Sequence, residues 1–258
     1  MEAHMNKNNY TEINSKVFDR LASEGWEWSV PVSHEDYVRA KNGDWNVLLT
    51  PKKYVPKYWL GDLKNRKILG LASGGGQQMP IFSALGAFCT VLDYSDRQLE
   101  SEKLVAEREN YKIEIIKADM TKNLPFEDSS FDMIFHPVSN CFIEDVQHVW
   151  KECYRVLKHG GLLLSGLDNG LNFLFDDIEN QPLKVINKLP YNPLKNEELY
   201  KKLMEEGDCI QFSHTLEEQI GGQLKAGFLL LDLYEDYNNI GVLKDYTPAF
   251  IATLAEKP

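Results

Sequence analysis

A glycine-rich stretch of the chain has the residue types to hold a nucleotide or a nucleoside. Residues 68–76 read ILGLASGGG, an apolar run that ends in three consecutive glycines. A glycine turn between a strand and a helix lets a ligand approach the backbone closely, and the first N–H groups of the helix are free to bind it. A tight turn also needs glycine for its own geometry, so this stretch alone leaves both interpretations open.

Two acidic residues stand at the ends of the next two predicted strands. Asp93 ends the apolar run FCTVLD, and from there a carboxylate can accept hydrogen bonds from both hydroxyls of a ribose. Asp119 ends KIEIIKAD, where a side-chain acceptor can bind an exocyclic amine such as that of adenine. Because parallel strands end at one edge of a sheet, the glycines and the two acids predict a single nucleoside-shaped site.

These residues need a sheet whose strands end together, and the pattern from residue 66 onward predicts one. Short apolar runs alternate with amphipathic segments, which is typical of parallel strands covered by helices. Two runs near the C-terminus are joined by a loop without room for a crossover helix, so they should pair antiparallel. We therefore predict an α/β fold, a Rossmann-like seven-stranded, mostly parallel sheet with helices on both faces and a C-terminal antiparallel hairpin. The predicted strands are 66–73, 88–94, 112–119, 131–139, 160–169, 228–237 and 249–257.

Capping signals place four of the helices. A Ser or Thr followed three residues later by Gln or Glu begins two of them, and an Asn and a Gly bound a third. In the fourth, apolar residues recur at helical spacing and basic residues precede a glycine. The predicted helices begin at Ser95 and Thr215, run from Asn196 to Gly207, and run from Asp145 to Lys158 with Gly160 as the stop.

Charge and cysteine content exclude several classes of protein. The 258 residues carry a formal net charge of −11, which disfavours a nucleic-acid partner. The four cysteines show no C-x-x-C pair and no histidine at ligand spacing, so we expect no metal site and no disulfide framework. No apolar stretch reaches about 20 residues and no signal-peptide core is present, so we expect a cytoplasmic protein without a membrane partner. We interpret the four residues before Met5 as an expression remnant, and the oligomeric state is left open.

The combination of motifs resembles the class I S-adenosylmethionine-dependent methyltransferases, in particular the methyltransferase type 11 group. Residues 68–76 are similar to its glycine loop, Asp93 to its ribose-binding acid and Asp119 to its adenine-contacting acid. The runs LPFEDSSFDMIF and VWKECYRVLKHGGLLL resemble its fourth strand, the following helix and its fifth strand. The resemblance implies S-adenosyl-L-methionine as the cofactor. It also implies a cofactor site formed by Ala72, Ser73, Gly74, Gly75, Gly76, Gln78, Asp93, Tyr94, Ser95, Asp119, Met120 and His136.

The chain departs from the family pattern at two places. The family carries an acid two positions before the first loop glycine, where this chain has Gly70, and Ala72 stands at that first glycine. We therefore expect backbone carbonyls or another side chain to hold the amino group of the cofactor. The histidine-rich stretch after the fourth strand is replaced by HPVSNCFIED, so no catalytic histidine is carried over from the family. His136 is the first candidate for a general base, with lining of the cofactor site as the alternative; His34 and His214 are weaker candidates.

Two long segments lie outside the repeating pattern. We interpret the whole chain, 1–258, as one domain with a cofactor-binding core at 63–169 and a C-terminal helix and hairpin at 215–258. Residues 1–62 hold four of the five tryptophans, and 170–214 is far longer than an ordinary connection. We expect 1–62 to cover the site and 170–214 to lie over it as an insertion, although both are also explained as packing extensions. The aromatic residues can face a sulfonium, a cation or a flat acceptor, or simply pack.

Three functions compete on these residues. The favoured one is methyl transfer from S-adenosylmethionine to a small-molecule acceptor by in-line displacement, in which alignment supplies most of the catalysis. A nicotinamide-dependent oxidoreductase uses a similar loop and acid, but Met79 and its neighbours do not complete G-x-G-x-x-G from Gly74. A non-catalytic module that binds the same cofactor would explain Gly70 and the missing histidines.

Overall fold

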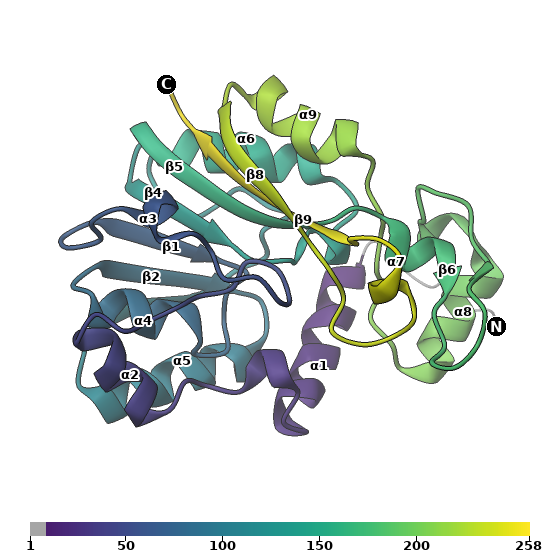
Figure 1. Ribbon diagram of the computed structural model, residues 1–258, viewed down its shortest axis with the longest axis horizontal. Coiled ribbons are helices and arrows are strands. Elements are labelled where there is room, and N and C mark those ends of the chain that lie inside the picture. Colours follow the sequence, from purple (N-terminus) through teal and green to yellow (C-terminus); the bar gives the residue numbers. More distant parts are fainter. Residues whose placement is uncertain (1–8) are drawn as a thin grey trace.

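The computed structural model describes residues 9–258, so the expected remnant before Met5 lies outside the described residues. A seven-stranded sheet with strand order β3-β2-β1-β4-β5-β9-β8 forms the centre of the molecule (Figure 1). Strands β1 to β5 run parallel, and β9 is antiparallel to both of its neighbours, β5 and β8. The predicted fold class is confirmed. The strands are β1 (Lys67–Leu71), β2 (Phe88–Asp93), β3 (Ile113–Lys117), β4 (Phe131–His136), β5 (Leu157–Asp168), β8 (Leu229–Asp236) and β9 (Phe250–Glu256).

Successive residues of each strand point to opposite faces of the sheet. Because residues on both faces are apolar, helices cover both faces. In β1, Ile68 packs in one apolar cluster with Met79. Its neighbours Leu69 and Leu71 belong to a second cluster with Trp150. Figure 1 shows helices on both sides of the sheet. The first side has α2 (His34–Lys41), α4 (Gln78–Ala84) and α5 (Asp96–Glu109), and the second has α6 (Val146–Val156) and α9 (Leu216–Ala226).

The boundary between α6 and β5 differs from the predicted one. The helix was expected to reach Lys158, but it ends at Val156 and the strand begins at Leu157. Gly160 is not a helix stop. It adopts a φ of 73° inside the strand, and its N–H donates to the carbonyl of Lys257 across the sheet at 2.7 Å. The pairing with the last strand therefore overrides the local helix signal.

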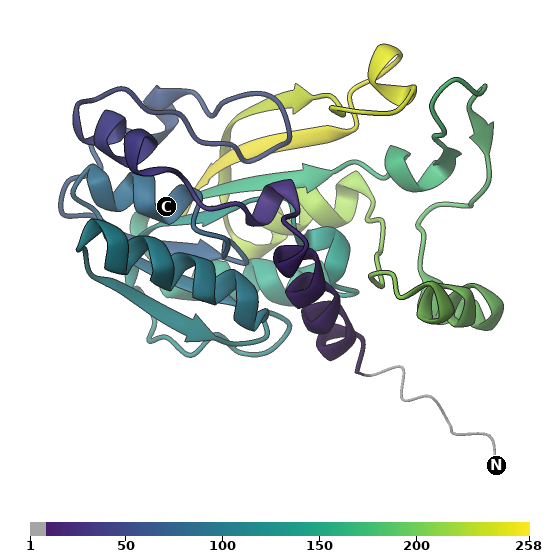
Figure 2. The ribbon, with the colours of Figure 1, turned by 90° about the horizontal axis from the view of Figure 1, so that it is seen from below.

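The segment 170–214 packs against the N-terminal helix α1 (Tyr10–Ser23) (Figure 2). Its own helix, α8 (Glu197–Glu206), is capped by Asn196 and ends at Gly207 in a left-handed conformation, as predicted. Residues from the segment form a small core with side chains of α1. This core contains Tyr200, Ile210 and Phe212, with Tyr10 and Ile13 against it. The segment also contains α7 (Leu171–Leu174), β6 (Phe175–Asp176) and β7 (Lys184–Val185).

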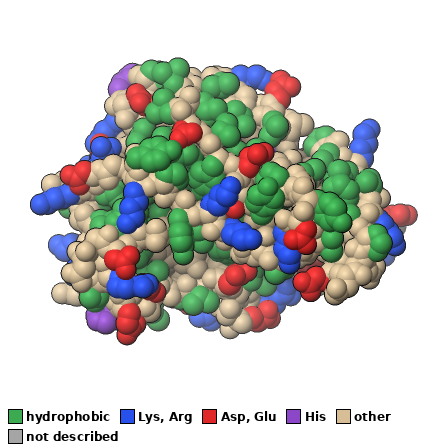
Figure 3. Space-filling model, viewed as in Figure 1, with side chains coloured by type: hydrophobic (Ala, Val, Ile, Leu, Met, Phe, Trp, Pro, Cys, Tyr) green, Lys and Arg blue, Asp and Glu red, His purple; other side chains and the backbone are tan. Residues whose placement is uncertain are grey.

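The edge strand β8 exposes alternating leucines to solvent. Leu229, Leu231 and Leu233 are about half exposed. Figure 3 shows hydrophobic side chains interspersed with charged ones on this side of the molecule, so no single apolar surface covers it. In the part of the chain that the structure describes, no helix has the length and apolar character to cross a bilayer.

Candidate active site

A cavity of about 300 Å³ lies at the carboxyl ends of strands β1 to β4. The loops that follow these strands form its floor, and Figure 2 shows α1 lying across this end of the sheet. The structure brings most of the predicted cofactor residues together here. Those that line the cavity are Ala72, Ser73, Gly74, Gln78, Asp93, Tyr94, Ser95, Asp119 and Met120. Of the predicted set, Gly75, Gly76 and His136 are not part of the lining.

The glycine loop is closely packed by the protein itself as well as open to the cavity. Gly75 and Gly76 have φ values of 99° and 72°, and Ala72 adopts 47°, a conformation that disfavours any side chain. A Cβ on Gly74 would lie 2.7 Å from the Cβ of Gln98, and one on Gly75 would lie 2.9 Å from the carbonyl oxygen of Trp28. The glycines therefore serve both the turn and the approach of the N-terminal segment. The need of the turn for glycine is confirmed, and the binding of a ligand at this loop stays a prediction.

Asp93 anchors the loop and keeps acceptor capacity toward the cavity. Its Oδ1 accepts N–H groups of Tyr94 at 2.8 Å and Ser95 at 3.0 Å, and its Oδ2 accepts the Gly74 N–H at 3.0 Å. Burial raises the pKa of Asp93, while these three donors act in the opposite direction. An ionised carboxylate has about four acceptor positions, so at least one remains for a ribose hydroxyl.

Asp119 offers a second acceptor on the next strand. Its Oδ1 accepts the N–H of Thr121 at 2.8 Å. Among residues 9–258, no hydrogen-bond partner is present for Oδ2. With the free position of Asp93 and the open backbone of the glycine loop, this arrangement fits the ribose and the base of a nucleoside cofactor.

Glu102 is a third carboxyl group at this loop, and the sequence interpretation missed it. The side chain is fully buried on α5, and its Oε1 accepts the N–H of Gly76 at 2.9 Å. Its Oε2 has no partner among the residues that the structure describes. Burial raises the pKa of Glu102 to about 8, and the charge of Asp93 adds to the shift. Glu102 follows the buried Gln98 by one helical turn, which was the available signal.

The histidine candidates do not reach the cavity. His136 is fully buried, with Nδ1 donating to the Leu71 carbonyl at 2.9 Å and Nε2 2.8 Å from the side-chain amide of Asn140. Burial lowers the pKa of His136, while its contacts with Leu71 and Asn140 act in the opposite direction, and the ring connects β4 to β1. His214 is buried, and its Nε2 lies 3.0 Å from the carbonyl oxygens of Asn140 and Ile143. His34 is exposed and pairs with Glu109. His136 ends β4, as expected, but its side chain does not line the cavity.

The N-terminal segment lines the cavity, whereas the insertion 170–214 does not. Residues of 11–51 form its outer wall, including Phe18, Trp26 and Trp28. No residue of 170–214, all of which the structure describes, lines the cavity. The insertion instead contacts α1, where the Asn14 side chain forms hydrogen bonds with the backbone N–H and carbonyl of Ile210. It is therefore not the direct wall of the site that we expected.

The missing acid at Gly70 has a steric explanation. A Cβ on Gly70 would lie 2.9 Å from the sulfur of Met79, which is completely buried. Met79 thus occupies the space that a side chain at position 70 would need. A side chain there would require the Met79 side chain to shift.

Comparison with known proteins shows the family to which the chain belongs. A family model described as a methyltransferase domain matches residues 69–165. The protein named "Uncharacterized methyltransferase YbaJ" of Bacillus subtilis is 44% identical over 248 residues, which cover 95% of this chain and 97% of the relative. The chain therefore belongs to the class I S-adenosylmethionine-dependent methyltransferases, within the methyltransferase-domain family.

More distant relatives share the fold or part of the chain. The crystal structure of an S-adenosylmethionine-dependent methyltransferase from Mesorhizobium loti has a TM-score of 0.63 at 18% identity, covering 78% of this chain and 94% of that one. Sterol 24-C-methyltransferase erg6 of Aspergillus fumigatus is 32% identical over 106 residues, 40% of this chain and 28% of the relative. The cofactor is S-adenosyl-L-methionine, and the nicotinamide alternative is no longer supported.

Proposed function

We propose that this enzyme transfers a methyl group to a small-molecule acceptor inside the cavity at the carboxyl end of the sheet. The observation that supports the proposal is the cover over this cavity, where α1, the two tryptophans Trp26 and Trp28, and residues 48–51 form an outer wall. A covered cavity of about 300 Å³ suits a small molecule better than a folded protein or a nucleic-acid strand. The name of the sterol methyltransferase relative is in line with this class of acceptor.

The chain's own residues hold and orient the reactants. Asp93 and Asp119 supply acceptors for the ribose and the base, and the glycine loop leaves room for the rest of the cofactor. The bound cofactor supplies an electrophilic methyl group on a sulfonium. The aromatic cover, Phe18, Trp26 and Trp28, excludes water and limits the acceptor to positions near the floor. Alignment of this kind accounts for much of the catalysis in an in-line displacement.

The acceptor class is tested by following a labelled methyl group. The protein is incubated with methyl-tritiated S-adenosylmethionine and an extract of Bacillus subtilis separated into protein, nucleic-acid and low-mass fractions. We expect label in the low-mass fraction, and an excess of S-adenosylhomocysteine should abolish it. Label in protein or nucleic acid alone would overturn the small-molecule proposal. No label in any fraction, despite binding of S-adenosylhomocysteine, would favour the non-catalytic module.

A further inference from the structure

The cavity has two chemically different halves. The glycine loop, Asp93 and Asp119 form one half, at the ends of β1 to β3. The other half lies on the far side of β1, after β4 and at the start of β9, and we call it the acceptor wall. The acceptor wall consists of residues 48–51, 137–139 and Phe250.

The acceptor wall carries no charge. Among the residues of 9–258 that line the cavity, none is Lys, Arg, His or Glu, and the only acids are Asp93 and Asp119 of the cofactor half. Cys141 lies nearby, and burial raises the pKa of its thiol well above the usual value, so it stays neutral. An acceptor with a permanent negative charge away from its reacting atom would therefore lose its hydration without gaining a cationic partner from the wall, which costs several kcal/mol. A cationic acceptor would meet the positive sulfonium of the cofactor.

The polar side chains around the acceptor wall are already paired within the protein. Thr50 Oγ1 donates to Asp236 at 2.8 Å, and Ser139 Oγ donates to the Pro137 carbonyl at 2.9 Å. On α1, Ser15 donates to the Tyr94 carbonyl at 2.7 Å, and Asn14 is bonded to the backbone of Ile210. The donor groups of these side chains are therefore already used, and they offer no free N–H or O–H to an anionic acceptor. What remains toward the acceptor is apolar surface, from side chains such as Leu48, Pro51 and Val138.

On the basis of the proposed function, we propose that the acceptor is a small, uncharged, apolar molecule whose nucleophile ionises without a protein base. A thiol is the first candidate, because its pKa of about 8.5 lies closer to neutrality than that of a phenol or an ammonium group. The acceptor loses its proton to water before transfer. Its thiolate sulfur then bonds to the methyl carbon while the donor's carbon–sulfur bond breaks toward the donor sulfur, which leaves two neutral thioethers.

Charge selection at the acceptor wall is tested by binding two product-like thioethers of the same shape. Protein saturated with S-adenosylhomocysteine is titrated in a calorimeter with 4-(methylthio)acetophenone and with 4-(methylthio)benzoate. We expect the uncharged ligand to bind at least ten times more tightly. The variant Val138→Lys, which adds a positive charge to the wall, should reduce or reverse the ratio of the two affinities. The uncharged control Val138→Met should preserve this ratio.

Each outcome decides between this inference and its alternatives. Equal or tighter binding of the benzoate to the unaltered protein would overturn the inference, and so would the absence of binding by both ligands. Neither result would affect the proposed function, which depends on the methyl-labelling experiment. Failure of the protein to bind S-adenosylhomocysteine at all would instead count against the cofactor site itself.

The absence of a protein base is tested by the pH dependence of turnover. The pH profile of kcat/KM is measured with a series of para-substituted thiophenols whose own pKa values differ. If the acceptor ionises on its own, the inflection of the profile should move with the pKa of each thiophenol. A single inflection at the same pH for every thiophenol would reveal a protein base and overturn this part of the inference.

Discussion

At the scale of single residues, two buried carboxyl groups share the space behind the glycine loop. Asp93 and Glu102 each accept an N–H of that loop, from Gly74 and Gly76. Asp93 has three donors, whereas Glu102 has one, and the pKa of Glu102 is raised to about 8. Glu102 is therefore protonated at neutral pH, whereas the three N–H donors of Asp93 oppose the upward shift of its pKa by burial.

Glu102 should make the protein less stable as the pH rises. The folded state keeps the proton up to about pH 8, whereas the unfolded chain releases it near the ordinary value of 4.5, so stability is lost between these values. Glu102→Gln stays neutral and still accepts the Gly76 N–H. Its free energy of unfolding, relative to the unaltered protein, should therefore rise by about 2 kcal/mol between pH 6 and pH 9 in urea titrations. The exposed Glu107→Gln on the same helix is the control, and parallel pH curves for both variants would contradict the assignment.

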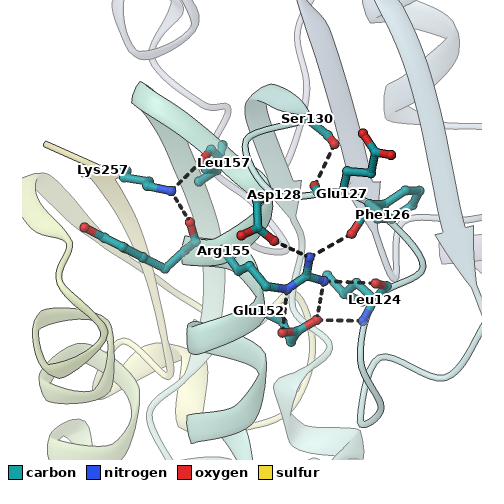
Figure 4. A network of polar contacts seen from close by, with 10 residues as sticks. Leu124, Phe126, Glu127, Asp128, Ser130, Glu152, Arg155, Leu157 and Lys257 are labelled. Atoms are coloured by element: carbon teal, nitrogen blue, oxygen red, sulfur yellow. Dashed lines mark hydrogen bonds and ion pairs between the residues drawn. The ribbon is translucent and has the colours of Figure 1, made fainter.

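At the scale of elements, one arginine connects helix α6 to the loop that precedes β4 (Figure 4). Arg155 pairs with Glu152 through two hydrogen bonds of 2.7 and 2.9 Å. It also donates to the carbonyls of Leu124 at 3.0 Å and Phe126 at 2.7 Å, and Glu152 accepts the Leu124 N–H at 2.7 Å. These contacts join the two runs that resemble the family, LPFEDSSFDMIF and VWKECYRVLKHGGLLL. Neither Arg155 nor Glu152 lines the cavity, so this pair stabilises the fold.

Arg155→Lys should weaken the fold and spare the cofactor site. A lysine cannot reproduce the planar set of donors, so several of these hydrogen bonds are lost. We expect the free energy of unfolding to fall by about 2 kcal/mol. The dissociation constant of S-adenosylhomocysteine should change by less than about twofold. Arg97→Lys, in an exposed ion pair on α5, should cost less than about 0.5 kcal/mol. A large loss of cofactor affinity in Arg155→Lys at full stability would contradict this role.

Strand β8 positions part of the acceptor wall from a distance. Asp236 is fully buried at the end of β8, and its Oδ2 accepts three donors at 2.8 Å: the Thr50 hydroxyl and the N–H groups of Lys52 and Lys53. Asp236→Ala would leave these donors without their partner. Hydrogen exchange of the Lys52 and Lys53 amides, followed by mass spectrometry, should accelerate at least tenfold. Glu235→Ala, at the exposed neighbour, should not change it. Unchanged exchange in Asp236→Ala would show that other contacts hold this loop.

The local pattern of residue types along the chain was sufficient to predict the sheet and part of the site. The strands, the capping residue Ser95 and the rim acids Asp93 and Asp119 lie where periodicity and turn chemistry predict them. The predicted end of α6 was wrong, because pairing with β9 sets this boundary. His136 ends β4 as predicted, but its contacts with Leu71 and Asn140 keep its side chain out of the cavity lining. Such contacts cannot be predicted from a local pattern, because they join residues far apart in the chain or depend on the conformation of the folded loop.

At the scale of the whole molecule, the cavity is built by segments that the repeating core does not contain. The core supplies the floor, and the N-terminal segment approaches so closely that the carbonyl oxygen of Trp28 lies 2.9 Å from where a Cβ of Gly75 would be. The insertion 170–214 supports α1 through Asn14 and the small core of Tyr200 and Phe212. The sequence showed that these segments are unusual but could not show which of them reaches the cavity, because that depends on tertiary packing.

Binding of S-adenosylhomocysteine, measured by calorimetry, is the most direct test of the cofactor site. The unaltered protein should bind one equivalent with a dissociation constant in the micromolar range. Asp119→Ala, which removes the free acceptor, and Asp93→Asn should each weaken binding at least tenfold. Glu127→Ala, an exposed acid outside the cavity, should leave it unchanged. A folded protein that binds no S-adenosylhomocysteine, or binds it equally well without Asp93 and Asp119, would contradict the assignment of this cavity as the cofactor site.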